Sequence, residues 1–415
     1  MVAWMLMIAA AQAAPDTVRI DVATALQRGL DLSPALEVAQ YRAEAADYRF
    51  DQVGAWPNPL IGISAENVGQ QRDFTGQSGL DGLEGQAVFT LGLPLGWERS
   101  GAISAAGADR RRMAAAVRVA DWDVRETLLG AIGGVLRDQE LGQSALEELT
   151  TLSRIANALA LQAERGRASD GDAARAALAR GMASTRHARR MAALAEGRAE
   201  LARLLGYPAT ETLRIDAPAC TDRSMPTGAT TTVPELDVAQ AGVHAARAAI
   251  QQAKGVRAPD LAPQVGVRRT GGRSGLFLGL STTLPLWDRG SARIQAARGE
   301  EMAALAAERQ VTERLASARV AAREGMVALE SGGAAFDEDW SNALDRAVTA
   351  AEARYELGEG TLFELLDSRR ARLQALDDYH AWLAEWWAAR ARLARLEGRA
   401  VDADLICLDP FRETP

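Results

Sequence analysis

The 415-residue sequence has few of the residues that build metal or cofactor sites. It holds only two cysteines, Cys220 and Cys407, and three scattered histidines. These residues show neither a C-x-x-C spacing nor a cluster of cysteine and histidine, which argues against a zinc site. After residue 13 no apolar run reaches the roughly 18 residues that a transmembrane helix needs. The formal net charge is −8, so we expect no nucleic-acid partner, because such binding rests on a basic surface.

Catalytic motifs are missing as well. The sequence has no P-loop, no G-x-S-x-G elbow and no H-E-x-x-H pair. The basic, Gly-rich stretch at residues 268–273 lies between two expected strands, which indicates a hairpin loop and not a phosphate site. The isolated histidines favour packing or surface roles. We therefore expect no enzyme, no bound metal and no cofactor.

The first residues are typical of an export signal. Residues 1–13 are uncharged and mostly apolar, and Ala11-Gln12-Ala13 forms an A-x-A cleavage site. The alternative is a frayed terminus, but the abrupt polar turn at Asp16 favours export. In an exported protein Cys220 and Cys407 could form one disulfide. Two buried free thiols are the open alternative, because the sequence does not bring the two cysteines together.

The rest of the chain is a tandem repeat. Leu201–Gly206 matches Leu393–Gly398, and Pro34–Gln40 matches Pro234–Gln240. A segment rich in Pro and Thr separates the halves. The expected division is a signal peptide (1–13), a first repeat (14–206), a linker (207–233), a second repeat (234–398) and a C-terminal tail (399–415).

Each half has the same order of elements: a helix, two short strands, a very long helix and a shorter helix. The expected helices span residues 33–55, 101–165 and 170–205, then 234–257, 291–357 and 361–397. The strands alternate, as where Leu276, Leu278 and Leu280 alternate with small or polar residues. This pattern fits a barrel wall between lipid and water, and it also fits an ordinary soluble sheet.

A helix of about 65 residues would be about 100 Å long and must pack against others as a coiled coil or bundle. The pairs Gly133-Gly134 and Gly332-Gly333 predict a bend or loosening in both halves. Four strands cannot close a barrel alone, so other subunits must complete it. The expected fold is mainly α with a small β part: a long α-helical coiled-coil barrel plus a transmembrane β-barrel shared between subunits.

These features together resemble the TolC-like outer-membrane efflux family over essentially the whole mature chain. The strongest local match is Arg354–Asp367, which is similar to the family's Gly-x-x-Thr hairpin tip, and Arg165–Asp170 is its first-half copy. The resemblance implies a homotrimer in the outer-membrane lipid that extends into the periplasm. It also implies a periplasmic adaptor (membrane fusion protein) and an inner-membrane pump as partners. The chain would be the exit duct, passively conducting solutes to the exterior.

The resemblance also assigns roles to residues at the tips. Glu364 and Asp367 match acids that line the constricted entrance of relatives, where rings of acids attract cations. They also fit ordinary first-turn acids near the positive end of a helix, and both roles can hold. Tyr355 and Asp172 match a pair that meets in closed relatives. Gly360 replaces an arginine that helps lock that closed state, so the lock here is looser or built differently.

Four further residues would shape the tips that the adaptor grips, and the plainer interpretation is that they only form turns. They are Gly166, Ser169, Gly358 and Thr361.

The prediction of the transported cargo depends on a weaker sequence pattern. Asn58-Pro59 and Glu66-Asn67-Val68 resemble the heavy-metal (CzcC-like) efflux branch. The alternative for the whole chain is a soluble periplasmic coiled-coil protein, structural or adaptor-like. It would share the helices but not the lipid-facing strands. A soluble helical enzyme is the third reading, and the missing motifs weigh against it.

Overall fold

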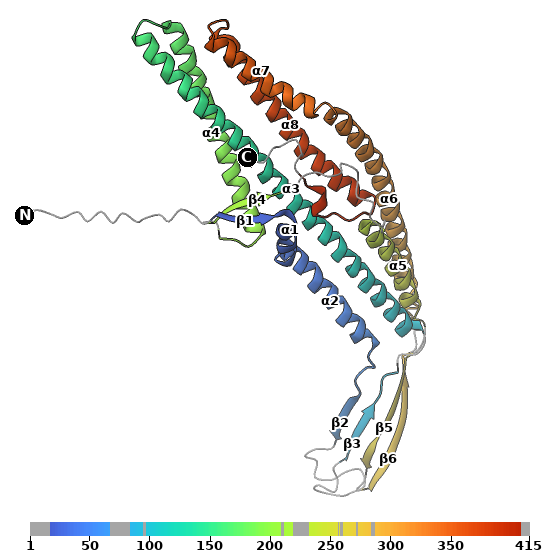
Figure 1. The fold of residues 1–415 in the computed structure, drawn as a ribbon. Helices are drawn as coiled ribbons and strands as arrows, with labels where there is room; N and C mark the ends of the chain where they lie inside the picture. Colours follow the sequence, from blue (N-terminus) through green and yellow to red (C-terminus); the bar gives the residue numbers. More distant parts are fainter. Residues whose placement is uncertain are drawn as a thin grey trace, which may run out of the picture. The chain divides into compact units, whose positions relative to one another are not determined.

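The computed structural model describes residues 17–66, 84–93, 97–208, 211–218, 232–255, 257, 260–270, 273–283 and 287–407. The expected signal peptide, Asn67-Val68, Cys220 and the last eight residues lie outside these ranges. The chain forms two compact units, each with segments from both repeats (Figure 1). Unit 1 comprises residues 1–36, 120–233 and 315–415, and unit 2 comprises residues 37–119 and 234–314.

Unit 2 contains an antiparallel sheet in the order β2-β3-β5-β6. Its strands are β2 (Leu60–Glu66), β3 (Glu84–Thr90), β5 (Leu261–Thr270) and β6 (Arg273–Thr282). The cross-strand register places large apolar side chains on one face, and all of them are exposed. They are Ile61, Ile63, Phe89, Val265, Val267, Leu276, Leu278 and Leu280. The predicted alternation is confirmed.

The four strand ends that lead to helices all lie at one end of the sheet. They lead to α2 (Pro34–Gly54), α3 (Trp97–Glu164), α5 (Pro234–Gly255) and α6 (Ser291–Gly333). Helices α3 and α5 pack backbone to backbone, because a Cβ at Gly101 or Gly255 would overlap the main chain of the other helix. Arg118 on α3 forms an ion pair of 2.5 Å with Asp237 on α5.

Unit 1 contains a small parallel sheet that the sequence did not predict. Strand β1 (Thr17–Asp21) pairs with β4 (Thr212–Asp216), and α1 (Val22–Asp31) follows β1. Strand β4 lies inside the segment expected to be a linker. The Gln139 amide on α3 bonds both the N–H and the C=O of Ile215 at 3.0 Å, which fixes β4 on the core.

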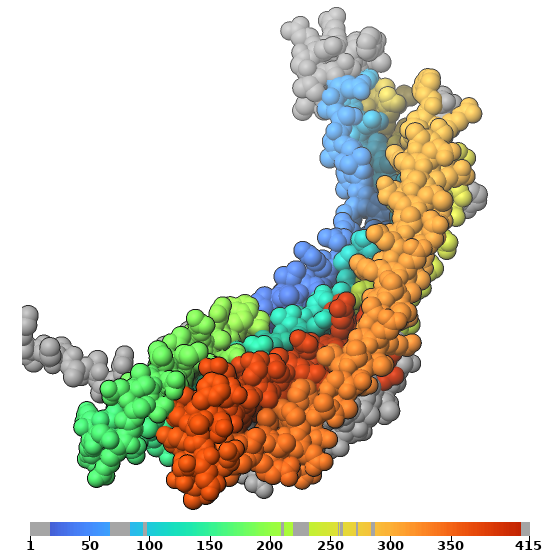
Figure 2. All heavy atoms as spheres, turned by 90° about the horizontal axis from the view of Figure 1, so that it is seen from above, coloured from blue at the N-terminus to red at the C-terminus, as the bar shows by residue number. Residues whose placement is uncertain are grey.

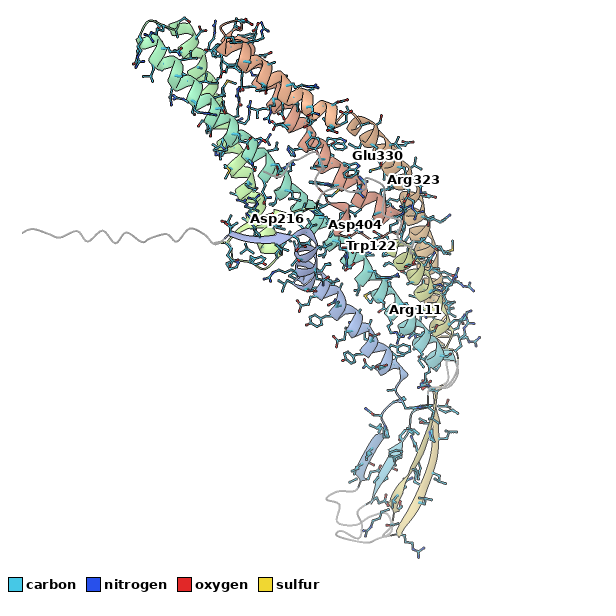
Figure 3. The ribbon with its side chains drawn as sticks, viewed as in Figure 1. Arg111, Trp122, Asp216, Arg323, Glu330 and Asp404 are labelled. Atoms are coloured by element: carbon cyan, nitrogen blue, oxygen red, sulfur yellow. The ribbon has the colours of Figure 1, made fainter. Side chains whose placement is uncertain are left out.

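Besides α1, the helices of unit 1 are the C-terminal part of α3, α4 (Asp170–Leu204), the end of α6, α7 (Glu338–Glu356) and α8 (Leu362–Leu396). Their core includes Trp386 and Trp387. Arg323 on α6, which is labelled in Figure 3, forms an ion pair of 2.8 Å with Glu397. A short 3-10 helix at Ala403–Leu405 packs on this core. None of the described helices combines the length and hydropathy needed to cross a membrane.

Cys407 is disulfide-bonded, which decides the question that the sequence left open. The only other cysteine in the chain is Cys220.

The predicted helix at residues 291–357 is two helices. Helix α6 ends at Gly333, and α7 begins after Asp337, whose side chain accepts a hydrogen bond of 2.8 Å from the Trp340 N–H. The loosening predicted at Gly332-Gly333 is thus confirmed. At Gly133-Gly134 the predicted loosening is absent, because α3 continues through both residues without a break. There the helix packs Gly133 against Trp387 and keeps its hydrogen bonds.

Candidate functional site at the hairpin tips

Two helical hairpins of unit 1 end in turns of the same design. Gly166 and Gly358 follow α3 and α7 with φ of 67° and 74°, a conformation that favours glycine. In the second turn the Gly358 N–H bonds the Tyr355 carbonyl at 3.1 Å and the Glu359 N–H bonds the Arg354 carbonyl at 2.9 Å. The first turn has the same two bonds, which define a Schellman motif. The glycines predicted as turn residues are therefore confirmed in that role.

Each turn leads directly into a capped helix. The Ser169 hydroxyl accepts from the Asp172 N–H at 3.0 Å and caps α4. Thr361 and Glu364 form a reciprocal capping box at the start of α8, with both bonds at 3.2 Å. Glu364 thus has the helix-start role that the plainer interpretation gave it.

The two tips lie side by side and pack together (Figures 1 and 2). Ala156 and Leu159 of α3 and Ala176 of α4 form one buried cluster with Leu362 of α8. Tyr355 packs against this cluster. Burial, and then the negative charge of Asp172, raise the pKa of the Tyr355 phenol, so it stays protonated and able to donate.

The structure places Tyr355 and Asp172 together, but the hydrogen bonds of Asp172 go to its own hairpin. Its carboxylate accepts from the Ser169 hydroxyl at 2.8 Å and from Arg175 at 3.2 Å. The influence of Asp172 on Tyr355 is therefore through its charge. At the position of the family's locking arginine, Gly360 lies against the Arg354 side chain.

Glu364 and Asp367 are both exposed on the first turns of α8. Arg354 approaches Glu364 at 3.8 Å. Asp367 lines a groove of about 340 Å³ between α4 and α8, together with exposed Leu178, Met182 and Phe363. The two acids thus remain available to ions in solution.

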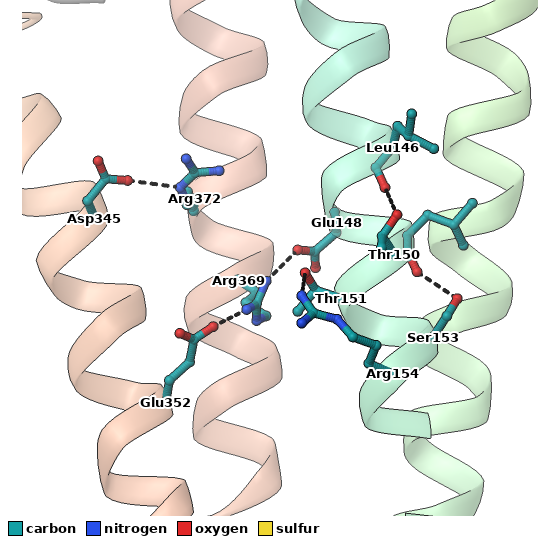
Figure 4. A network of polar contacts seen from close by, with 11 residues as sticks. Leu146, Glu148, Thr150, Thr151, Ser153, Arg154, Asp345, Glu352, Arg369 and Arg372 are labelled. Carbon is teal, nitrogen blue, oxygen red and sulfur yellow. Dashed lines mark hydrogen bonds and ion pairs between the residues drawn. The ribbon is translucent and has the colours of Figure 1, made fainter. Parts of the chain in front are cut away.

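A set of ion pairs that no sequence pattern indicated holds α8 to its neighbours (Figure 4). Arg369 of α8 bonds Glu148 of α3 at 3.0 Å and also pairs with Glu352 of α7. The side chains of Arg369 and Glu148 are only 13% and 9% exposed. Arg372 of α8 pairs with Asp345 of α7 at 3.2 Å. Because burial makes a charge costly without its partner, Arg369 strongly favours this arrangement of α3, α7 and α8.

The described residues contain no group of three or more His, Cys, Asp or Glu that could hold a metal ion. The tips offer charge, a groove and a set of interlocked helix ends. Such an arrangement can admit or repel ions and can dock a protein. Long helical hairpins that end in such tips, together with a sheet whose exposed face is apolar, define a membrane channel protein.

Comparisons with known proteins agree with this class. The family model described as outer membrane efflux protein matches residues 229–399. A search of curated proteins finds no significant match. The fold is similar to the outer-membrane channel OprN (20% identity, TM-score 0.76), with 91% of this chain and 90% of OprN covered.

Two further channels have the same fold. The Campylobacter jejuni CmeC outer membrane channel is 14% identical with a TM-score of 0.74, over 90% of this chain and 84% of CmeC. The open state of the Neisseria gonorrhoeae MtrE outer membrane channel is 18% identical with a TM-score of 0.73, over 93% and 90%. Residues 229–399 thus match the outer membrane efflux protein family, and the whole chain has the fold of the TolC-like channels. It is an efflux channel of the outer membrane that extends into the periplasm.

Proposed function

We propose that three copies of the chain, with residues 1–13 removed on export, form one duct. The sheet of unit 2 supports this, because it has an exposed apolar face and two edge strands, β2 and β6, that have no further strand beside them in the described part of the chain. Lipid provides no partner for the backbone groups of an open edge. Sheets from three chains joined edge to edge satisfy those groups and close a barrel in the outer membrane.

The hairpin tips form the periplasmic entrance of this duct. The observation that carries the proposal is the packing of Tyr355 between the two tips, beside the charge of Asp172, with Glu364 and Asp367 exposed on the following helix. Three copies of each acid make two acidic rings that attract cations and repel anions. The capping role of Glu364 is compatible with this, because its carboxylate stays exposed.

The entrance opens when α7 and α8 move relative to α3 and α4. Arg369 of α8 opposes this movement through its ion pair with Glu148 of α3, whereas its pair with Glu352 of α7 stays within the moving hairpin. Tyr355 opposes it by packing, and Gly360 supplies no arginine to strengthen the closed state.

The partners are a periplasmic adaptor and an inner-membrane pump. The turns at Gly166–Ser169 and Gly358–Thr361 give the adaptor two rigid, similarly shaped ends to grip. The cargo class is cations, with heavy-metal ions indicated by Asn58-Pro59 and Glu66-Asn67-Val68. The duct conducts passively, as a channel and not an enzyme, and the pump selects which solutes are transported.

Single-channel conductance of the detergent-purified protein in a planar bilayer tests the entrance. Glu364→Ala/Asp367→Ala should lower cation selectivity, because it removes both acidic rings. The matched control is Glu338→Ala/Asp339→Ala, which removes two first-turn acids from α7. If the acids act only on the helix dipole, the two variants behave alike and the entrance role is lost.

The same experiment tests the duct itself. A pore whose selectivity is unchanged by the tip variant keeps the channel and rejects the acidic entrance. A protein that forms no pore and stays dispersed without detergent is the periplasmic coiled-coil alternative.

A further inference from the structure

The end of the sheet that lies away from the helices carries an ordered set of charges. The ends of β2, β3, β5 and β6 that lead to helices lie at one end of the sheet, and the paired strand ends Glu66–Glu84 and Thr270–Arg273 lie at the other (Figure 1). The helices of an outer-membrane channel extend into the periplasm, so the hairpin end is the outward end.

The strand register places four charged residues on one face at this end. Glu66 lies opposite Glu84, and Thr270 lies opposite Arg273. Gln86 lies opposite Arg268. Side chains two residues apart on a strand share a face, as do directly paired ones. Glu66, Glu84, Arg268 and Arg273 therefore all lie on the face opposite the apolar one, which carries Val267 and Leu276.

The charges are segregated by strand. Both acids are on β2 and β3, and both arginines are on β5 and β6. Glu66 and Glu84 are directly opposed like charges, an arrangement that weakens a strand pair. No ion pair within the described part of the chain joins these acids to the arginines. Packing among the described residues gives no reason for this arrangement.

We infer that the outer mouth of the duct is lined by alternating acidic and basic sectors and acts as a second charge filter. The inference rests on the proposed closure of three sheets into a barrel, which turns the polar face toward the lumen. Going around the mouth, each acidic β2–β3 pair is followed by a basic β5–β6 pair. Fields of opposite sign then lie side by side across one opening.

This mouth differs from the proposed acidic entrance, because its two kinds of sector favour ions of opposite sign. Cations pass along the acidic sectors and anions along the basic ones, and a zwitterionic solute can contact both. The acidic sectors then raise the cation-to-anion permeability ratio of the pore, and the basic sectors lower it.

Reversal potentials in a salt gradient test the inference. Glu66→Gln/Glu84→Gln should lower the cation-to-anion permeability ratio, and Arg268→Gln/Arg273→Gln should raise it, each by about twofold. Both shifts should fade near 1 M salt, where the screening length is about 3 Å. The matched control is Arg269→Gln on the same strand, because Arg269 pairs with Ser274 on the apolar face and should leave the ratio unchanged.

The outcomes separate this inference from the proposed function. A conducting pore whose ratio moves with neither pair, or moves in one direction with both, overturns the charge filter and leaves the duct intact. Equal effects of Arg269→Gln and Arg268→Gln/Arg273→Gln overturn the assignment of faces. A wild-type protein that forms no pore overturns the duct, and the mouth with it.

Discussion

At the scale of single residues, the partly buried histidine of α8, His380, makes stability depend on pH. Burial, and then the positive charges of Arg190 and Arg137, lower the pKa of His380 from its ordinary value of 6.5 to about 4. The ring of Tyr379 lies against it with centroids 5.1 Å apart. The neutral imidazole is therefore the form that the fold accepts, and protonation belongs to the unfolded chain.

The sign of the effect follows from proton binding. Between pH 6.5 and pH 4 the unfolded chain binds a proton at His380 that the folded chain does not. Stability is thus full above pH 6.5 and falls on acidification. We expect a loss of about 2 kcal/mol per chain between pH 7 and pH 5 from this residue. Thermal unfolding of His380→Gln should show that much less pH dependence, and an unchanged slope would contradict the prediction.

At the scale of elements, the break between α6 and α7 depends on one glycine and an aromatic cluster. Phe336 packs edge-on against Trp340 and Tyr379, with centroids at 5.0 and 5.3 Å. Trp382 donates from its indole N–H to the Leu329 carbonyl at 2.9 Å. A Cβ at Gly333 would overlap this indole, so the helix can approach α8 only with glycine there.

Gly333→Ala should therefore destabilise unit 1 by about 1–3 kcal/mol, the usual cost of overpacking. Gly332→Ala is the matched control, because a Cβ there meets nothing within 4 Å. Urea or thermal unfolding in detergent compares the two variants with wild type. If both shift the midpoint equally, the effect comes from helix propensity and not from Trp382.

The sequence predicts those elements whose limits are set locally. The helix starts at Pro34 and Pro234 and the capped tips at Ser169 and Thr361 depend on nearby residues, so pattern and spacing place them well. The pairing of β1 with β4 and the bond from Arg369 to Glu148, 221 residues apart, depend on tertiary packing. No local pattern carries that information. The break after Gly333 is intermediate, because the glycine is visible and its partner Trp382 is not.

At the scale of the whole molecule, a single chain leaves too much apolar surface exposed. Leu276, Leu278 and Leu280 on β6 are 73%, 72% and 66% exposed, and Ile63 on β2 is 80% exposed. Both of these strands are edges. A face of this kind needs lipid, and edges of this kind need further strands. Assembly and membrane insertion are thus two requirements of the same sheet.

A pair of arginine substitutions on β6 separates its two faces. Leu278→Arg places a charge on the apolar face near the middle of the strand. A charge facing lipid there destabilises the inserted barrel by about 2–4 kcal/mol. Gly275→Arg places the same charge on the polar face, where a Cβ meets nothing within 4 Å. We expect Leu278→Arg to reduce the trimer recovered from outer-membrane fractions, and Gly275→Arg to leave it near the wild-type amount. Cross-linking and native mass measurement in detergent give the stoichiometry. Equal recovery of both variants would mean that the apolar face does not contact lipid, and wild-type protein found only as a monomer would contradict closure by three chains.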